Sequence, residues 1–267
     1  MTSNGTTWTV DTVRSADGTM IAYETAGEGP PIILVGGAFN DRGTTRPLAA
    51  ALASDFTVYG YDRRGRGASG DTGPYAVRRE IEDLAALIDR TGGRSHLYGL
   101  SSGAILAAYA AAEGLPVIAL ALFEPPFQAG PHGGPKPGLA VRLAELVSAG
   151  QRDDAVGLFL IEAVGVPAEA VSGMRGTPEW AWMEGLAHTL AYDTTVTGGG
   201  ELPAARLATI AVPTVVVDST GSPGWLRDAA AATAGAIPGA THLSLAGGFH
   251  EVPPETLAPA LRAALLH

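Results

Sequence analysis

Apolar and polar positions along the chain separate short strands from longer helices. Near the start, Trp8–Arg14 and Met20–Thr25 alternate apolar and polar residues on either side of Ala16–Gly18, a pattern typical of a β-hairpin. Pro31–Val35 and Pro116–Phe123 are instead continuous apolar runs, which indicates strands buried on both faces. Such strands need helices on both sides, so the pattern predicts an α/β fold built on a mostly parallel sheet.

The rest of the chain, outside its middle part, also alternates strand-like and helix-like segments. The further predicted strands are Phe56–Tyr61, Ser95–Tyr98, Pro213–Asp218 and Thr241–Leu245. The predicted helices between and after them are Pro47–Ala53, Tyr75–Thr91, Ala104–Ala112, Leu226–Ala236 and Pro254–Leu265. Crossover helices of this kind are what parallel strands require.

The middle part of the chain has a different residue pattern, with helix-like segments and no strand-like ones. Residues 126–137 are rich in Pro and Gly, and no strand pattern follows until after residue 205. Helical patterns fill the stretch instead, at Leu139–Ser148, Asp153–Val164, Pro167–Met174 and Pro178–Tyr192. We therefore expect residues 127–205 to form a helical cap, inserted into a core domain made of residues 1–126 and 206–267.

One motif stands where a predicted strand turns into a helix. Gly99, Ser101 and Gly103 form a Gly-x-Ser-x-Gly sequence between Ser95–Tyr98 and Ala104–Ala112. This is the context of a nucleophile elbow, in which glycines let strand and helix approach closely. Ser101 is thus the candidate nucleophile, and it needs a base to remove its proton. The alternative is a structural serine in a glycine-rich turn.

Composition narrows the function classes. The chain has 267 residues, 46% apolar and 16% charged, which suits a globular protein with a sizeable core. Its net charge of −10 disfavours nucleic acid and anionic membranes as partners. The absence of cysteine excludes disulfides, thiolate catalysis and cysteine-ligated metals.

Targeting and cofactor motifs are also missing from the sequence. No secretion signal opens the chain, and no uncharged apolar stretch reaches the ~20 residues that span a bilayer, so we expect a cytoplasmic protein. There is no P-loop, dinucleotide fingerprint or metal-ligand spacing. We therefore expect no cofactor and no metal, a small-molecule substrate as the partner, and a monomer or homodimer.

Four segments together resemble the α/β-hydrolase family, and the resemblance spans nearly the whole chain. They are Val35–Ala38, Tyr61–Ser69, the motif around Ser101, and Gly247–His250, each at the family's position. The resemblance implies an eight-stranded sheet and a helical lid over the active site, which fits residues 127–205. A serine at the elbow argues against haloalkane dehalogenases and most epoxide hydrolases, which need an aspartate there.

The resemblance implies a base and leaves the acid open. Of the six histidines, only His250 follows the last predicted strand by a short glycine loop, where the family places its general base. The usual position of the acid is occupied by Ser222. Glu124, which ends the strand before the cap, is our preferred acid because haloalkane dehalogenases carry theirs there. Asp218, at the tip of its own strand, is the rival. A carboxylate capping the cap entrance is the alternative role for Glu124.

The resemblance also implies an oxyanion hole. The backbone N–H of Ser102, which follows the nucleophile, is the first expected donor, while its side chain is expected to pack or to support the site from behind. The N–H of Ala38 is the expected second donor, with Phe39 as an off-by-one alternative. Large side chains of the cap and loops should line an apolar pocket. The expected pocket residues are Gly37, Phe39, Phe127, Trp182, His188, Trp225 and Phe249.

Three arginines, Arg63, Arg64 and Arg66, lie in the glycine-rich loop after the fourth predicted strand. A phosphate site there is conceivable, but the family uses this loop structurally, and we interpret the cluster in that way.

These features point to a serine hydrolase of small-to-medium apolar esters, lactones or thioesters that forms an acyl-enzyme on Ser101. The alternatives are a non-hydrolytic member of the same fold (a cyclase, acyltransferase or lyase) and a ligand-binding protein that has lost its chemistry.

Overall fold

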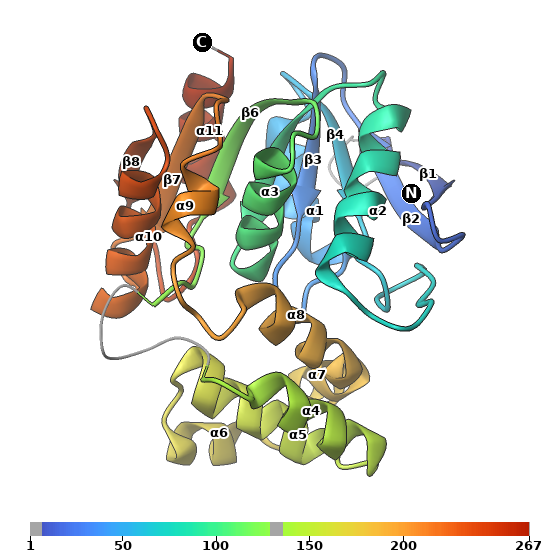
Figure 1. The fold of residues 1–267 in the computed structure, drawn as a ribbon, viewed down its shortest axis with the longest axis vertical. Helices are drawn as coiled ribbons and strands as arrows, with labels where there is room; N and C mark the ends of the chain where they lie inside the picture. Colours follow the sequence, from blue (N-terminus) through green and yellow to red (C-terminus); the bar gives the residue numbers. More distant parts are fainter. Residues whose placement is uncertain (1–6, 129–135, 267) are drawn as a thin grey trace.

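An eight-stranded sheet forms the centre of the computed structural model, which describes residues 7–128 and 136–266; residues 129–135 of the predicted cap lie outside this description. The strand order is β1-β2-β4-β3-β5-β6-β7-β8 (Figure 1). The strands are β1 (Thr9–Arg14), β2 (Met20–Ala26), β3 (Pro31–Val35), β4 (Thr57–Tyr61), β5 (Ser95–Leu100), β6 (Val117–Phe123), β7 (Thr214–Ser219) and β8 (Thr241–Leu245). The β1–β2 and β2–β4 pairs are antiparallel and all others parallel, so the predicted α/β-hydrolase fold is confirmed.

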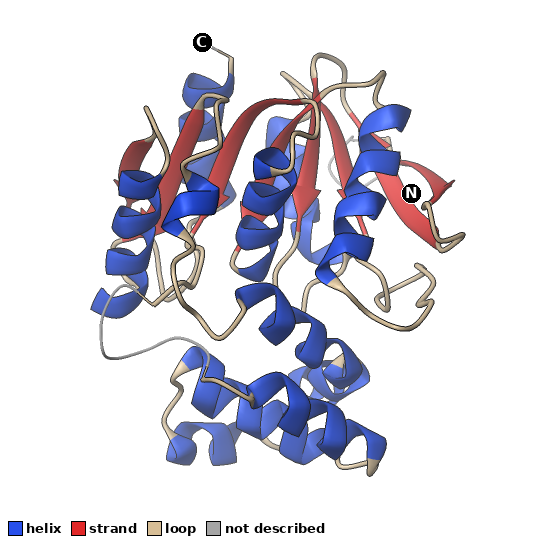
Figure 2. Ribbon diagram, viewed as in Figure 1, coloured by secondary structure: helices blue, strands red, loops and turns tan. Residues whose placement is uncertain are grey.

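Helices cover both faces of the sheet (Figure 2). One face carries α2 (Val77–Arg90), α3 (Ser102–Ala112) and α10 (Gly224–Ala236). The other face carries α1 (Arg42–Leu52) and α11 (Pro254–Leu265). The sheet is therefore apolar on both faces. For example, Ile33 and Val35 of β3 pack against α2, α3 and α10, while Ile32 and Leu34 pack against α1 and α11.

The register of the central strands brings the site together. Val35 of β3 pairs with Gly99 of β5, and Leu100 of β5 pairs with Phe123 of β6. The carboxyl ends of three parallel strands therefore meet at one edge of the sheet. In open α/β sheets this is the edge where ligands bind.

A helical insert follows β6 and lies across that edge (Figure 1). Its helices are α4 (Leu139–Ser148), α5 (Arg152–Phe159), the π-helix η1 (Leu160–Val164), α6 (Ala168–Met174), α7 (Pro178–Gly185), the 3₁₀-helix η2 (Ala187–Thr189) and α8 (Leu190–Thr197). Trp180, Met183 and Leu143 belong to a separate apolar core inside the insert. The short helix α9 (Ala204–Leu207) then leads back to β7 and contacts α3 and α10.

Some helices differ from their prediction. Helix α1 begins at Arg42 instead of Pro47, because Asp41 caps it: its carboxylate accepts the Thr44 N–H at 2.9 Å, and the Thr44 hydroxyl accepts the Asp41 N–H at 3.3 Å. The predicted helix Pro178–Tyr192 is divided into α7, η2 and the start of α8.

Candidate active site

The turn at Ser101 has the geometry of a nucleophile elbow. Ser101 sits between β5 and α3 with φ +57° and ψ −123°. A Cβ at Gly99 would lie 2.5 Å from the Gly103 carbonyl oxygen, and one at Gly103 would lie 2.3 Å from the Val35 carbonyl oxygen. Only glycine fits at these two positions, so they allow the close approach of strand and helix that exposes the serine.

Backbone strain is concentrated around this turn. Within the described residues, the non-glycine residues with positive φ are Phe39, Ser101, Glu124 and His250, at +56°, +57°, +45° and +52°. Each lies in a loop just after a strand, and all four belong to the predicted site. Unfavourable backbone conformations persist where the surrounding structure imposes them, and they cluster at functional sites.

Glu124 holds the imidazole of His250. Its Oε2 lies 2.5 Å from His250 Nδ1, and its Oε1 accepts the Ser219 N–H at 2.8 Å. The carboxylate is fully buried, so both oxygens are fixed. Ser222, at the position where the family places its acid, instead accepts the backbone N–H of His250 at 2.8 Å. The Glu124–His250 pair thus has the geometry of the orienting half of a triad.

Asp218 lies elsewhere. Its Oδ2 is 2.6 Å from His242 Nε2 and accepts the Ser244 hydroxyl at 3.0 Å, while its Oδ1 accepts from Arg227 Nε at 3.2 Å. These partners belong to β8 and α10, away from His250. Of the two carboxylates considered from sequence, only Glu124 contacts the predicted base.

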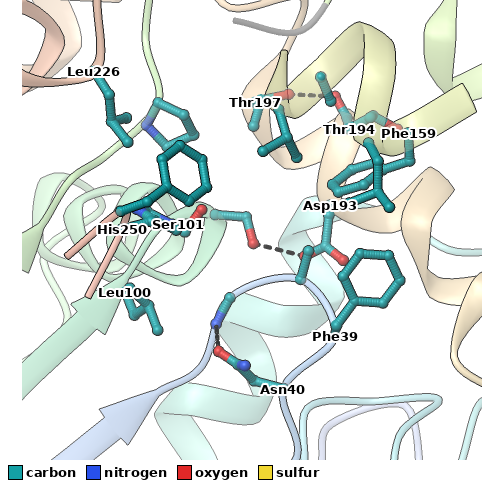
Figure 3. A pocket seen from close by; sticks show the side chains of 18 of the residues that line it. Phe39, Asn40, Leu100, Ser101, Phe159, Asp193, Thr194, Thr197, Leu226 and His250 are labelled. Atoms are coloured by element: carbon teal, nitrogen blue, oxygen red, sulfur yellow. Dashed lines mark hydrogen bonds between the residues drawn. The ribbon is translucent and has the colours of Figure 1, made fainter. Parts of the chain in front are cut away.

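A cavity of about 270 Å³ opens beside Ser101 and His250 (Figure 3). Its wall is mostly apolar, with a few polar groups on the core side and on α8. The lining residues are Gly37, Ala38, Phe39, Asn40, Leu100, Ser101, Ser102, Pro126, Phe159, Leu160, Ala163, Val164, Asp193, Thr194, Thr197, Trp225, Leu226, Phe249 and His250. A partly open, mostly apolar cavity with convergent polar groups is typical of a small-molecule site.

Four of the expected pocket residues line this cavity: Gly37, Phe39, Trp225 and Phe249. The other three do not, which corrects the expectation.

Each of these three has a different environment. Phe127 is buried against Tyr109 in the main core, with ring centroids 6.5 Å apart. Trp182 is 42% exposed on α7. His188 Nε2 lies 2.8 Å from the Gly65 carbonyl oxygen. The sequence pattern alone did not show which way these side chains point.

The loop after β3 is arranged around the nucleophile. The Gly37 N–H donates to Asn40 Oδ1 at 2.8 Å, which leaves the next N–H in the loop, that of Ala38, as the expected donor to a substrate. A Cβ at Gly37 would lie 2.9 Å from Ser101 Cβ, so the loop backbone passes directly beside the serine. Ser102 begins α3, and its N–H is among the first four of the helix, which have no partner within the helix.

Asp193 of α8 is a pocket residue that the sequence did not reveal. It is buried and accepts hydrogen bonds from the Ser102 hydroxyl at 2.7 Å, from Arg63 at 2.8 Å and from Arg66 at 2.8 Å. Burial alone would raise the pKa of Asp193, but Arg66 and Arg63 outweigh it and hold that pKa below its usual value. A separation of 127 residues between Arg66 and Asp193 hid the contact from pattern reasoning.

The arginines of the loop after β4 form ion pairs with carboxylates of the protein itself. Glu80 receives two hydrogen bonds from Arg63, both 2.6 Å long. Arg64 pairs with Asp83 at 2.7 Å and with Asp17 at 2.9 Å. This geometry supports the structural interpretation of the loop over a phosphate site.

The π-helix η1 was also missed. Leu160, Ala163 and Val164 of this segment line the cavity. A π-turn is wider than an α-turn and is often found at functional sites. Its hydrogen-bond pattern has no signature that the apolar spacing of the predicted helix Asp153–Val164 could reveal.

The described residues contain neither a metal-binding cluster nor a membrane-spanning helix. Within residues 7–128 and 136–266, no group of three or more His, Cys, Asp or Glu side chains is placed to hold a metal ion. Over the same part of the chain, the helices are all too short or too polar to cross a membrane.

Comparisons with known proteins agree with this architecture. A model of the alpha/beta hydrolase family matches residues 32–260. The crystal structure of an alpha/beta hydrolase from Sphaerobacter thermophilus DSM 20745 is 50% identical, with a TM-score of 0.89, and the alignment covers 94% of this chain and 98% of that chain. A hydrolase structure from Pseudomonas aeruginosa PA01 is 25% identical, with a TM-score of 0.76 and coverage of 96% and 98%.

Curated relatives match over shorter stretches. A hydrolase from Azorhizobium caulinodans is 38% identical over 86 residues, which are 32% of this chain and 32% of that protein. The chain thus matches about a third of the length of this relative.

Proposed function

The chain belongs to the α/β hydrolase family, and on that premise we propose that it is a serine hydrolase acting on small, uncharged esters, lactones or thioesters. The observation that carries the proposal is the contact between the buried Glu124 carboxylate and His250 Nδ1, at 2.5 Å, in the loop beside the Ser101 elbow. In this arrangement Glu124 keeps the proton on Nδ1, so that Nε2 is free to act as a base.

The reaction then follows two steps. The Ser101 oxygen forms a bond to the acyl carbon while His250 Nε2 takes the serine proton, and the N–H groups of Ala38 and Ser102 stabilise the negative oxygen. His250 returns the proton to the leaving alkoxide or thiolate as its bond to the acyl carbon breaks. In the second step His250 Nε2 takes a proton from water while the water oxygen bonds to the acyl carbon. The bond between that carbon and the Ser101 oxygen then breaks, and His250 returns the proton to Ser101 as the acid leaves.

The Ser101 hydroxyl and the His250 imidazole must come closer together during this cycle. Among the described residues, no hydrogen bond of 3.5 Å or less joins the Ser101 hydroxyl to His250. Catalytic hydrogen bonds are often long before substrate binds and shorten in the Michaelis complex. A rotation of the Ser101 side chain toward the imidazole is therefore part of the proposed mechanism.

The cavity supports the proposed substrate class. Its volume of about 270 Å³ is less than twice that of a cavity that holds benzene, about 150 Å³. Its described lining contains no arginine or lysine, and its one buried carboxylate, Asp193, is already paired with arginines behind the wall. An anionic acyl group would find no cation here, so uncharged substrates are favoured.

Hydrolysis of a panel of p-nitrophenyl esters tests the proposal. We expect activity on neutral acetate to hexanoate esters, weaker activity on decanoate, and little on a hemisuccinate that carries a carboxylate. Ser101→Ala should remove the activity, while Ser172→Ala, at an exposed helix position on the cap, should retain it. A folded wild type that hydrolyses no ester, lactone or thioester of the panel, or an active Ser101→Ala variant, would contradict the proposal.

A further inference from the structure

Two arginines hold the backbone of the loop that faces the nucleophile. Arg63 Nη1 donates to the Gly36 carbonyl at 3.2 Å. Arg66 Nη1 donates to the Gly37 carbonyl and, at 3.3 Å, to that of Asn40. Both guanidinium groups are buried, so these hydrogen bonds are made away from water and are stronger for it.

The contact with Gly37 fixes one particular peptide plane. The Gly37 carbonyl and the Ala38 N–H belong to the same trans peptide group and point in opposite directions. A donor that holds the carbonyl from behind therefore aims the Ala38 N–H toward the cavity. It also polarises the peptide, which makes that N–H a better donor. The N–H of Phe39, the off-by-one alternative, belongs to a plane that neither arginine holds.

Asp193 holds the arginines. Arg66 Nη2 donates to both of its carboxylate oxygens, each at 2.8 Å, and Arg63 Nη1 donates to Oδ1 at 2.8 Å. The same Oδ1 accepts the Ser102 hydroxyl at 2.7 Å. Ser102 provides the other expected oxyanion donor through its backbone N–H, so one carboxylate is connected to both donors.

Asp193 belongs to the cap, and the groups that it holds belong to the core. It lies on α8, whereas Arg63 and Arg66 follow β4, and Ser102 begins α3. The fork of Arg66 bonds the Asp193 carboxylate with one arm and the loop carbonyls with the other. A displacement of α8 would therefore loosen the peptide plane between Gly37 and Ala38, whose carbonyl would keep only the Asn40 N–H at 3.3 Å.

We propose that Asp193 is a positioning residue for the oxyanion hole, through which docking of cap helix α8 orients the Ala38 and Ser102 N–H groups. The inference rests on the proposed serine hydrolase function. It assigns to the cap a role in turnover as well as in enclosing the substrate.

The same loop supplies a matched control. Arg64, between the two arginines in sequence, is buried and makes a two-armed ion pair with Asp83 at 2.9 and 2.7 Å. Its remaining bonds go to Asp17 and to the Arg79 carbonyl, away from the loop after β3. Asp83→Asn therefore breaks an ion pair of the same kind without touching the oxyanion loop.

Steady-state kinetics and the rate of fluorophosphonate labelling would be measured for Asp193→Asn and Asp83→Asn, each well below its own melting temperature. For Asp193→Asn we expect kcat and the maximal labelling rate to fall together by about ten- to hundredfold, with KM within about threefold of wild type. Asp83→Asn should lose thermal stability but keep kcat within about threefold. An intact kcat in Asp193→Asn, or a rise in KM alone, would overturn the inference.

A second variant covers the case in which Asp193→Asn does not fold. Arg66→Lys keeps a positive charge opposite Asp193 but replaces the planar fork by a single ammonium group, which cannot hold the Gly37 carbonyl and both carboxylate oxygens together. It should lower kcat by about tenfold or more with little change in KM. Unchanged kcat here would contradict the role assigned to Asp193. Wild type that hydrolyses no ester would instead remove the proposed function itself.

Discussion

The ends of β6 and β7 offer a comparison within one sheet. Glu124 directly follows β6, and Asp218 lies near the end of the adjacent parallel strand β7. Both carboxylates are fully buried, and each lies within 2.6 Å of a histidine nitrogen. Their surroundings differ: the histidine of Glu124 lines the cavity with Ser101, whereas the histidine of Asp218 lies on the edge strand β8.

The backbone explains the difference. Glu124 lies just past the end of β6 with φ +45°, a left-handed turn that takes its side chain out of the sheet toward the loop of His250. Asp218 is still part of β7 and pairs in register with Ser244, so its carboxylate remains over the sheet near α10. A buried carboxylate–histidine pair is therefore a candidate for catalysis only where the chain also places a nucleophile and a cavity.

Removing the charge of each carboxylate gives the largest predicted difference. Glu124→Gln should lower kcat by about 10³- to 10⁴-fold, because the amide no longer holds the proton on His250 Nδ1 or stabilises the imidazolium. Asp218→Asn should leave kcat within about threefold of wild type. Ester hydrolysis by the two purified variants measures both; comparable losses would remove the distinction between the two carboxylates.

Ser222 tests what the β7 end contributes to the site. Its hydroxyl accepts the His250 backbone N–H at 2.8 Å, so Ser222→Ala should loosen the loop that carries the base. One neutral hydrogen bond is worth about 0.5–1.5 kcal/mol, so we expect kcat to fall by about three- to tenfold. If the fall matched that of Glu124→Gln, orientation of His250 would depend on the loop instead of the carboxylate.

Replacing Asp218 should change the stability of the protein instead of its catalytic rate. Asp218→Asn weakens three hydrogen bonds that join β7, β8 and α10, so the free energy of unfolding should drop by about 1–3 kcal/mol. Urea unfolding followed by circular dichroism measures it. A variant as stable as wild type would show that the Asp218 cluster has no structural role.

His96 offers a contrast to the two carboxylate-paired histidines. It is buried, and its Nδ1 has no hydrogen bond within the described residues. Burial, followed by the charge of Arg94, lowers the pKa of His96. The folded state then binds fewer protons than the unfolded chain, so stability is full above the unfolded value of about 6.5 and falls as pH drops toward the folded pKa.

His96→Phe should remove that part of the pH dependence, the smallest of the predicted effects. The new ring would stand beside Phe56, whose ring lies 5.7 Å from that of His96. Melting temperatures between pH 8 and 5 compare the two proteins. Parallel curves for wild type and variant would contradict the assignment to His96.

The sequence could predict what lies at strand ends. Ser101 was predicted from its motif between a strand and a helix, and the carboxyl ends of parallel strands meet at one edge of the sheet. His250 and Glu124 were selected by the resemblance to the α/β-hydrolase family, since strand order alone did not separate Glu124 from Asp218. The confirmed sheet and helical insert rest on the apolar periodicity along the chain.

Side-chain direction in the cap was not accessible in this way. Trp182 and Phe159 both lie in apolar helical segments, yet only Phe159 lines the cavity. Its ring packs against Phe39 of the loop after β3, with centroids 5.4 Å apart, whereas Trp182 is 42% exposed. Asp193 was hidden for a different reason: it gains its role only from arginines of a distant loop.

The central claim is that Ser101 is a nucleophile activated by His250 and Glu124. The most direct test is the intact mass of the protein after exposure to a fluorophosphonate probe. We predict one adduct on wild type, mapped to the peptide that contains Ser101, at a rate greatly reduced in Glu124→Gln and unchanged in Asp218→Asn. Ser101→Ala should take no adduct. A folded wild type without an adduct, or an adduct that persists in Ser101→Ala, would contradict the account.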